Sequence, residues 1–147
     1  MNKKQAKILI ILITVLVLID QIIKIASVLS NAIIQTTNNQ KAENNISYIL
    51  ISIIAIILLV RYIKRNNIYI KMDSRIILSF AIAGCISNLI DRIWNGGIIN
   101  YINIPKFVPL NLGYIYILVT WIGMAAILTR YTVERINEKN EKRNNSK

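Results

Sequence analysis

Long apolar segments, separated by shorter polar and charged stretches, dominate the pattern of this 147-residue chain. Four such segments cover residues 8–29, 46–63, 76–93 and 112–129. Each approaches the roughly 20 residues that an α-helix needs to cross a bilayer. The pattern therefore predicts an all-α integral membrane protein with four transmembrane helices, in which residues 1–147 form a single membrane domain.

The first segment has a second interpretation, a signal peptide that is removed after export. Two charged residues, Asp20 and Lys24, interrupt its end, and no clear small-x-small cleavage site follows. We therefore expect an uncleaved helix.

Basic residues are distributed unevenly between the predicted loops. Of the 18 Lys and Arg residues, 14 lie before the first segment, between residues 61 and 75, or after residue 129. The other two loops contain only Lys41 and Lys106. Because cytoplasmic loops of membrane proteins are enriched in Lys and Arg, both termini are predicted to be cytoplasmic, with residues 130–147 as a cytoplasmic tail.

The segments outside the spans predict smaller elements. In the tail, Glu134 and Glu138 lie four residues apart and basic residues repeat at the same spacing, which is typical of a short solvated helix. On the other side of the membrane, residues 30–45 and 96–109 are predicted to form small extracytoplasmic loop or β elements, with a short sheet between them.

The composition excludes several classes of function. The chain has no histidine, which excludes His-based catalysis and His-ligated metal sites. Its one cysteine, Cys85, excludes an internal disulfide. The net charge of +11 follows mostly from the cytoplasmic segments and requires no nucleic-acid partner. We expect no metal and no cofactor, and membrane lipid as a partner.

Polar side chains occur at the outer ends of two predicted helices. Asp20 and Lys24 lie four residues apart and share one face of the first helix. The third helix also runs outward, so Asn88, Asp91 and Arg92 lie near the same membrane surface. Charged groups within a span are costly unless they pair or face a cavity. The first pair alone could simply neutralise itself, but two clusters at one level predict chemistry, or recognition of a lipid headgroup or peptide, near the extracytoplasmic face.

Four motifs along the chain resemble those of signal peptidase II, the lipoprotein signal peptidase family. Residues 20–24 (DQIIK) resemble its D-Q-x-x-K, and residues 87–92 (SNLIDR) resemble its G-N-x-x-D-R. Residues 97–102 (GIINYI) are similar to its G-x-V-x-D-F-I, and residues 110–114 (LNLGY) fall where the family has F-N-x-A-D. The length, the four predicted spans and the basic loops also match.

The resemblance implies an integral-membrane aspartyl endopeptidase of the bacterial plasma membrane, which cleaves signal peptides from diacylglyceryl-modified prolipoproteins. Two family aspartates share the chemistry: one activates water and the other protonates the carbonyl or leaving group. Their positions are occupied here by Asn100 and Tyr114. The other matched polar residues would form the framework of a substrate-binding site: Asp20, Lys24, Asn88, Asp91, Arg92 and Asn111.

Neither replacement can act as the missing carboxylate. An amide does not lose a proton at accessible pH, so Asn100 cannot be the base, and a tyrosine with a pKa of about 10 activates water poorly. From residue 94 to 129 the chain has no Asp or Glu, so no shift of the alignment restores the pair. The sequence therefore predicts a catalytically impaired homologue that binds lipoprotein signal segments or modulates another membrane peptidase.

Two other interpretations are open. The chain could be an active peptidase that uses other groups, either Asp20 with Asp91, or Ser27 or Ser87 with Lys24 as the base. Ion pairing disfavours a proton shared by the two acids, and nothing in the sequence fixes the geometry of a Ser/Lys pair. A small four-helix transporter is the third interpretation; it expects an unpaired acid deep in a span, whereas Asp20 has Lys24 one turn away.

Three further features bear on the resemblance. Asn44 or Asn45 in the first outer loop corresponds to a family asparagine that faces the site, and the sequence does not decide between them. Residues 82–85 (IAGC) resemble the lipobox of a substrate, but they lie inside the third span, where small residues indicate close helix packing. Trp94 and Tyr101 are expected to be interfacial anchors.

Overall fold

The computed structural model describes residues 2–30, 35–36, 50–51, 53–58, 61 and 72–145. Three helices in this part of the chain are long and apolar enough to cross a membrane. They are α1 (Lys3–Leu29), α3 (Met72–Asn95) and α4 (Leu112–Asn145), which contain the predicted spans 8–29, 76–93 and 112–129. Three of the predicted spans are therefore confirmed as helices of membrane-crossing length.

The predicted second span, 46–63, lies partly outside the described residues. Positions 50–51, 53–58 and 61 within it are helical. A fourth membrane crossing, and with it the cytoplasmic placement of both termini, stays a prediction. Asn44 and Asn45 also lie outside the described residues.

The helix α1 exposes most of its apolar side chains and buries its charged pair, Asp20 and Lys24. It begins at Asn2, whose side chain accepts a hydrogen bond from Gln5 N at 2.8 Å, while the Gln5 side chain accepts one from Asn2 N at 3.4 Å. Apolar residues such as Ile10 and Ile22 are exposed along the span. The buried positions repeat every seven or four residues and so form one face: Leu9, Leu16, Asp20 and Lys24. Such a helix contacts lipid on one side and protein on the other.

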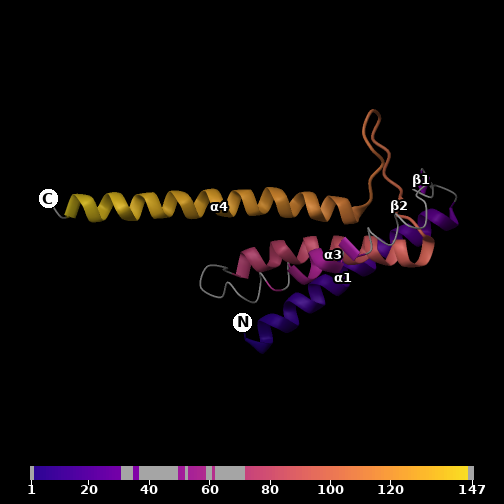
Figure 1. Ribbon diagram of the computed structural model, residues 1–147, viewed down its shortest axis with the longest axis horizontal. Helices are drawn as coiled ribbons and strands as arrows, with labels where there is room; N and C mark the ends of the chain where they lie inside the picture. Colours follow the sequence, from indigo (N-terminus) through magenta and orange to yellow (C-terminus); the bar gives the residue numbers. More distant parts are fainter. Residues whose placement is uncertain are drawn as a thin grey trace.

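The helix α3 lies alongside both α1 and α4 (Figure 1). Its fully buried Ala83 packs with Leu16 of α1 and Tyr116 of α4. The rings of Phe80 and Tyr116 meet edge to face, with centroids 5.8 Å apart. A second apolar cluster includes Ile82, also on α3. These contacts place α3 at the centre of the three helices.

Gly84 lets α3 approach the beginning of α4 closely. A Cβ atom at this position would lie 2.3 Å from the carbonyl oxygen of Gly113, which is shorter than any real contact. Small residues permit such close approach between membrane helices. The close packing predicted for the small residues of 82–85 is therefore confirmed.

We expect Gly84→Ala to destabilise the protein by about 1–3 kcal/mol, the usual penalty for overpacking. Its methyl group would meet backbone, so only a shift of the helices can relieve the contact. Gly123→Ala is the matched control, because a Cβ there meets only the side chain of Ile77, at 2.8 Å, whose end can move. Thermal unfolding in detergent measures both variants, and equal losses would contradict this explanation.

Short β elements lie at the end of the bundle where the polar residues gather. The strand β1 (Gln35–Thr36) pairs antiparallel with β2 (Ile99–Asn100), so that Gln35 lies opposite Asn100. The chain then forms a hairpin in which Ile102 pairs with Leu110, and this hairpin projects sideways from the helices (Figure 1). The predicted pairing between residues 30–45 and 96–109 is confirmed for these two strands.

The helix α4 extends far beyond the other two helices (Figure 1). From Arg130 to residue 144 its side chains are exposed, and Arg130 pairs with Glu134 at 3.0 Å. The solvated helix predicted for the tail is confirmed as far as Asn145, and it is continuous with the span that precedes it.

Candidate functional site

A buried lysine joins the two acidic residues of the spans. Lys24 Nζ lies 2.7 Å from Asp20 Oδ2 and 2.7 Å from Asp91 Oδ2. All three residues are at most 1% exposed. Charges removed from water in this way are stable only when paired and hydrogen-bonded. One ammonium therefore ties α1 to α3 through two carboxylates.

Neutral side chains satisfy the remaining polar atoms around Lys24. Lys24 also donates to Asn88 Oδ1 at 3.1 Å and to Ser87 Oγ at 3.3 Å. The Ser87 hydroxyl donates to Asp20 Oδ2 at 2.5 Å. Gln21 Nε2 donates to Asp91 Oδ1 at 3.0 Å. Asp20 and Lys24 share one helix face, as do Ser87 and Asp91, so two four-residue spacings bring the whole group together.

The loop before α4 closes this cluster on its outer side. Ile99 N, in β2, donates to Asp91 Oδ2 at 3.2 Å. The Tyr101 hydroxyl donates to Asp20 Oδ1 at 2.9 Å and accepts from Leu112 N at 3.1 Å. Burial, with the neighbouring Asp20 carboxylate, raises the pKa of Tyr101, so its hydroxyl is a donor at physiological pH. Tyr101 thus connects α1 to the first turn of α4.

We expect Tyr101→Phe to lower the free energy of unfolding by about 1–2 kcal/mol, because Asp20 and Leu112 N each lose a partner. A pKa raised in the folded state gives stability that is complete below the unfolded value of about 10 and is lost at higher pH. The difference between wild type and variant should therefore shrink above pH ~10. Unfolding in detergent at neutral and alkaline pH measures it, and a difference that grew with pH would contradict the assignment.

Asn111 immediately precedes α4 and contacts three other elements of the site. Its Oδ1 accepts from Tyr114 N at 3.0 Å, which caps the helix. Its Nδ2 lies 3.0 Å from each of three oxygens: Asn88 Oδ1, Ile99 O and Asn100 Oδ1. The side chain is fully buried. Asn111 therefore links α3, β2 and α4 at one point.

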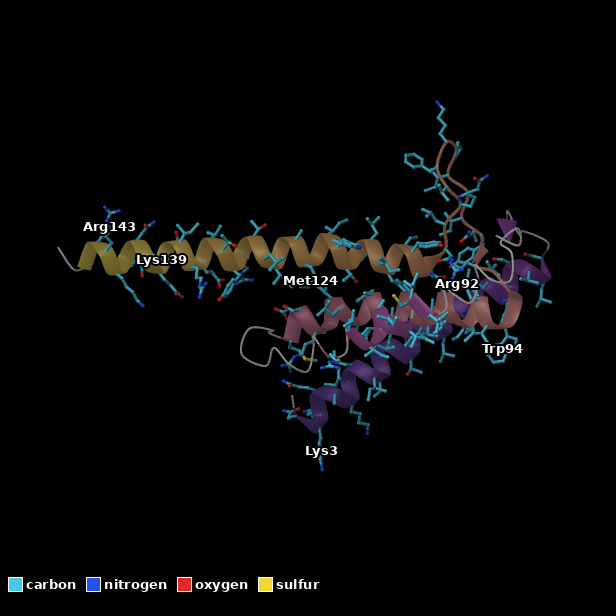
Figure 2. All side chains as sticks on the ribbon, in the orientation of Figure 1. Lys3, Arg92, Trp94, Met124, Lys139 and Arg143 are labelled. Carbon is cyan, nitrogen blue, oxygen red and sulfur yellow. The ribbon has the colours of Figure 1, made fainter. Side chains whose placement is uncertain are left out.

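The structure brings most of the predicted site residues into contact. Six of them form one network of ion pairs and hydrogen bonds: Asp20, Lys24, Asn88, Asp91, Asn100 and Asn111. Tyr114 joins it through its backbone N–H. Arg92 and Asp91 both lie within electrostatic reach of the Tyr114 hydroxyl, and Figure 2 shows Arg92 near the start of α4.

Two residues of the network, Gln21 and Tyr101, were not predicted as site residues, and Ser87 was considered only as a nucleophile beside Lys24. Gln21 and Ser87 stand within the matched motifs and next to predicted site residues, and that position was the available signal. Tyr101 was predicted as an interfacial anchor, but its hydroxyl contacts Asp20 inside the site. Tyr101 follows Asn100 directly in the sequence, but this position did not predict the contact. Side chains in loops do not point in directions that repeat at a fixed spacing, as those of helices and strands do.

The geometry disfavours the two alternative catalytic arrangements, an Asp20/Asp91 pair and a serine with Lys24 as its base. Asp20 and Asp91 contact the same ammonium, which occupies the place that a shared proton would need. Lys24 donates to Ser87 and to both acids, and so does not present a lone pair to a serine. The Ser27 hydroxyl donates to Ile23 O within α1. Among the described residues, no group of three or more Cys, Asp or Glu could hold a metal ion.

Comparisons with known proteins show the fold. No protein-family model matches the chain, and no curated protein matches it. It is similar to a bacterial membrane enzyme solved by the in meso method at 2.3 Å, with a TM-score of 0.71, 20% identity, and 86% of this chain and 90% of that chain covered. A second solved structure with the same description, at 1.9 Å, has a TM-score of 0.70 and 20% identity, with 83% of this chain and 92% of that chain covered. The chain therefore has the fold of a bacterial membrane enzyme.

Proposed function

We propose that this chain is a catalytically impaired relative of signal peptidase II, which binds the signal segments of lipoproteins at the outer face of the bacterial plasma membrane. Four sequence motifs support the proposal, because residues from all of them meet in one buried network. The membrane-enzyme fold is compatible with it.

The observation that carries the proposal is the environment of Asn100 and Tyr114. Both contact the same amide: Asn100 Oδ1 accepts from Asn111 Nδ2, and Tyr114 N donates to Asn111 Oδ1. Two residues that are 14 positions apart in sequence are thus joined through one side chain, that of Asn111. They occupy the positions of the family's aspartates, and neither carries a carboxylate.

The remaining acids cannot easily take over the reaction. A carboxylate pair works when one group is protonated and the other is not, because like charges at short distance cannot both ionise. Asp20 and Asp91 instead contact Lys24 and are committed to holding α1 against α3. The protein would therefore keep a signal segment bound without cutting it, and so limit its supply to a true peptidase in the same membrane.

Purified protein with a diacylglyceryl-modified prolipoprotein tests the proposal directly. We expect binding without release of the signal peptide. Cleavage that is abolished by Asp20→Asn or Asp91→Asn, but retained in Asn100→Ala, would show an active peptidase that uses other groups. Absence of both binding and cleavage would reject a role in lipoprotein processing.

A further inference from the structure

The hairpin between β2 and α4 ends in a defined turn. Phe107 N donates to Ile104 O at 3.0 Å, and Lys106 has φ 71°. With Pro105 before Lys106, these are the features of a type II turn. The turn fixes which side chains stand at the end of the hairpin, and residues 104–108 are called the hairpin tip below.

The hairpin tip exposes apolar side chains. Ile104, Phe107 and Val108 are 43%, 72% and 75% exposed. Turns that face water are built mostly from Gly, Asn, Asp and Ser, whereas a contiguous exposed apolar patch marks a surface that contacts protein or lipid. The composition of the tip therefore indicates a contact with something other than water.

The hairpin leaves the bundle at the level where α4 begins. Its base is the pair Ile102 and Leu110, which exchange two backbone hydrogen bonds of 2.9 Å just before Leu112, the first residue of α4. Figure 1 shows the hairpin directed across the axis of α4. Because α4 is long and apolar enough to cross a membrane along its axis, a hairpin across that axis extends over the membrane surface beside the helices.

A lipid surface matches both kinds of side chain at the tip. Lys106 is the only charged residue between positions 101 and 110, and no acid occurs from residue 94 to 129. Lipid offers hydrocarbon to the apolar side chains and, a few ångströms above it, phosphate to the lysine ammonium. Trp94, 80% exposed, lies at the same end of the bundle (Figure 2), and tryptophan is enriched at membrane surfaces.

We propose that the hairpin tip inserts Phe107 and Val108 into the lipid leaflet next to the site, with Lys106 bound to lipid phosphate. The inference does not depend on the proposed function, since it rests on the hairpin alone. The base of the hairpin belongs to the site, because Tyr101 donates to Asp20 and Asn111 contacts Asn100. Lipid contact at the tip would thus hold in place the loop that closes the buried cluster.

Nitroxide labels on single cysteines, in nanodiscs of phosphatidylcholine and phosphatidylglycerol, measure where the tip lies. In a Cys85→Ala background, the label is attached at Val108→Cys, at Ile122→Cys on the exposed apolar face of α4, or at Asn140→Cys in the tail. Oxygen concentrates in lipid and a water-soluble nickel complex stays outside it, so the ratio of their collision rates reports depth. We expect the ratio at position 108 to be close to that at 122 and well above that at 140.

The other results would overturn the proposal in distinguishable ways. A ratio at position 108 equal to that at 140 would place the tip in water. Protection of this label from both reagents would mean that protein covers the tip. Dipolar broadening between two such labels would identify that protein as a second copy of the chain.

A matched pair of variants assigns the depth to the apolar tip. Phe107→Asp should shift the ratio at position 108 toward the value at 140, because a carboxylate is costly in hydrocarbon and is repelled by phosphate. Asn95→Asp introduces the same charge at an exposed position outside the hairpin and should leave the ratio unchanged. The label at position 122 reports in both variants that the bundle is intact. An unchanged ratio in Phe107→Asp would also overturn the proposal.

Discussion

Replacing Lys24 by methionine is expected to destabilise the helix bundle by about 3–5 kcal/mol, the usual effect of removing one partner of a buried ion pair. Methionine fills similar space but leaves Asp20 and Asp91 buried without the ammonium that each contacts at 2.7 Å. The remaining donors, from Gln21, Ser87, Tyr101 and the backbone N–H of Ile99, are neutral. They cannot compensate for two like charges at short distance.

Two further variants make this result specific. Lys7→Met removes the same side chain from an exposed position of α1 and should change stability little. Adding Asp20→Asn and Asp91→Asn to Lys24→Met removes the uncompensated charges and should restore much of the loss. Detergent-solubilised proteins are compared by thermal unfolding. A Lys24→Met protein as stable as Lys7→Met would mean that the buried ion pairs do not hold α1 to α3.

The sequence predicted the three described spans because lipid imposes a simple pattern. A helix in hydrocarbon needs about 20 apolar residues, whatever its neighbours. The inward faces could be inferred only where polar residues marked them, as Asp20 and Lys24 do on α1. The apolar inward residues, such as Leu16 and Ala83, do not differ in type from those that face lipid.

Most residues of the buried network were named from the sequence, but their contacts were not predicted. The sequence placed Asp20 with Lys24 one turn away, and Asp91 next to Arg92. The structure shows that Lys24 pairs with both acids, because Asp91 faces α1 across the helix contact. Spacing along one helix identifies partners on that helix, but a partner on another helix depends on how the two helices pack. The central place of Asn111, which joins three elements, was inaccessible for the same reason.

Local sequence patterns predicted the helix of the tail, but they could not predict the register of the pairing between β1 and β2. The charge spacing of residues 130–143 predicted a solvated helix, since such contacts are local, and α4 does continue through them. The pairing of β1 with β2 joins residues that are far apart in sequence, such as Gln35 and Asn100. It could be predicted only as a pairing between two outer loops, since the register depends on where α1 and α3 end in space.

Under the proposed function, introducing carboxylates at positions 100 and 114 is expected to turn the protein into a peptidase. The double variant Asn100→Asp, Tyr114→Asp introduces acids at two residues that both contact Asn111, and the carboxylate at position 100 can accept the same hydrogen bond that Asn100 Oδ1 accepts now. Replacing the half-buried Tyr114 ring by a smaller side chain also makes room for a water molecule. General acid–base catalysis contributes about 10²–10⁴-fold, so cleavage of a diacylglyceryl-modified prolipoprotein should rise by at least about 100-fold above wild type.

Each single variant should remain inactive, because the mechanism needs one acid and one base at once. The control is Asn103→Asp with Tyr131→Asp, which makes the same two changes at exposed positions and should give no cleavage. Binding of the prolipoprotein serves as the measure of folding. A double variant that binds the prolipoprotein and fails to cleave it would show that more than the carboxylates has been lost.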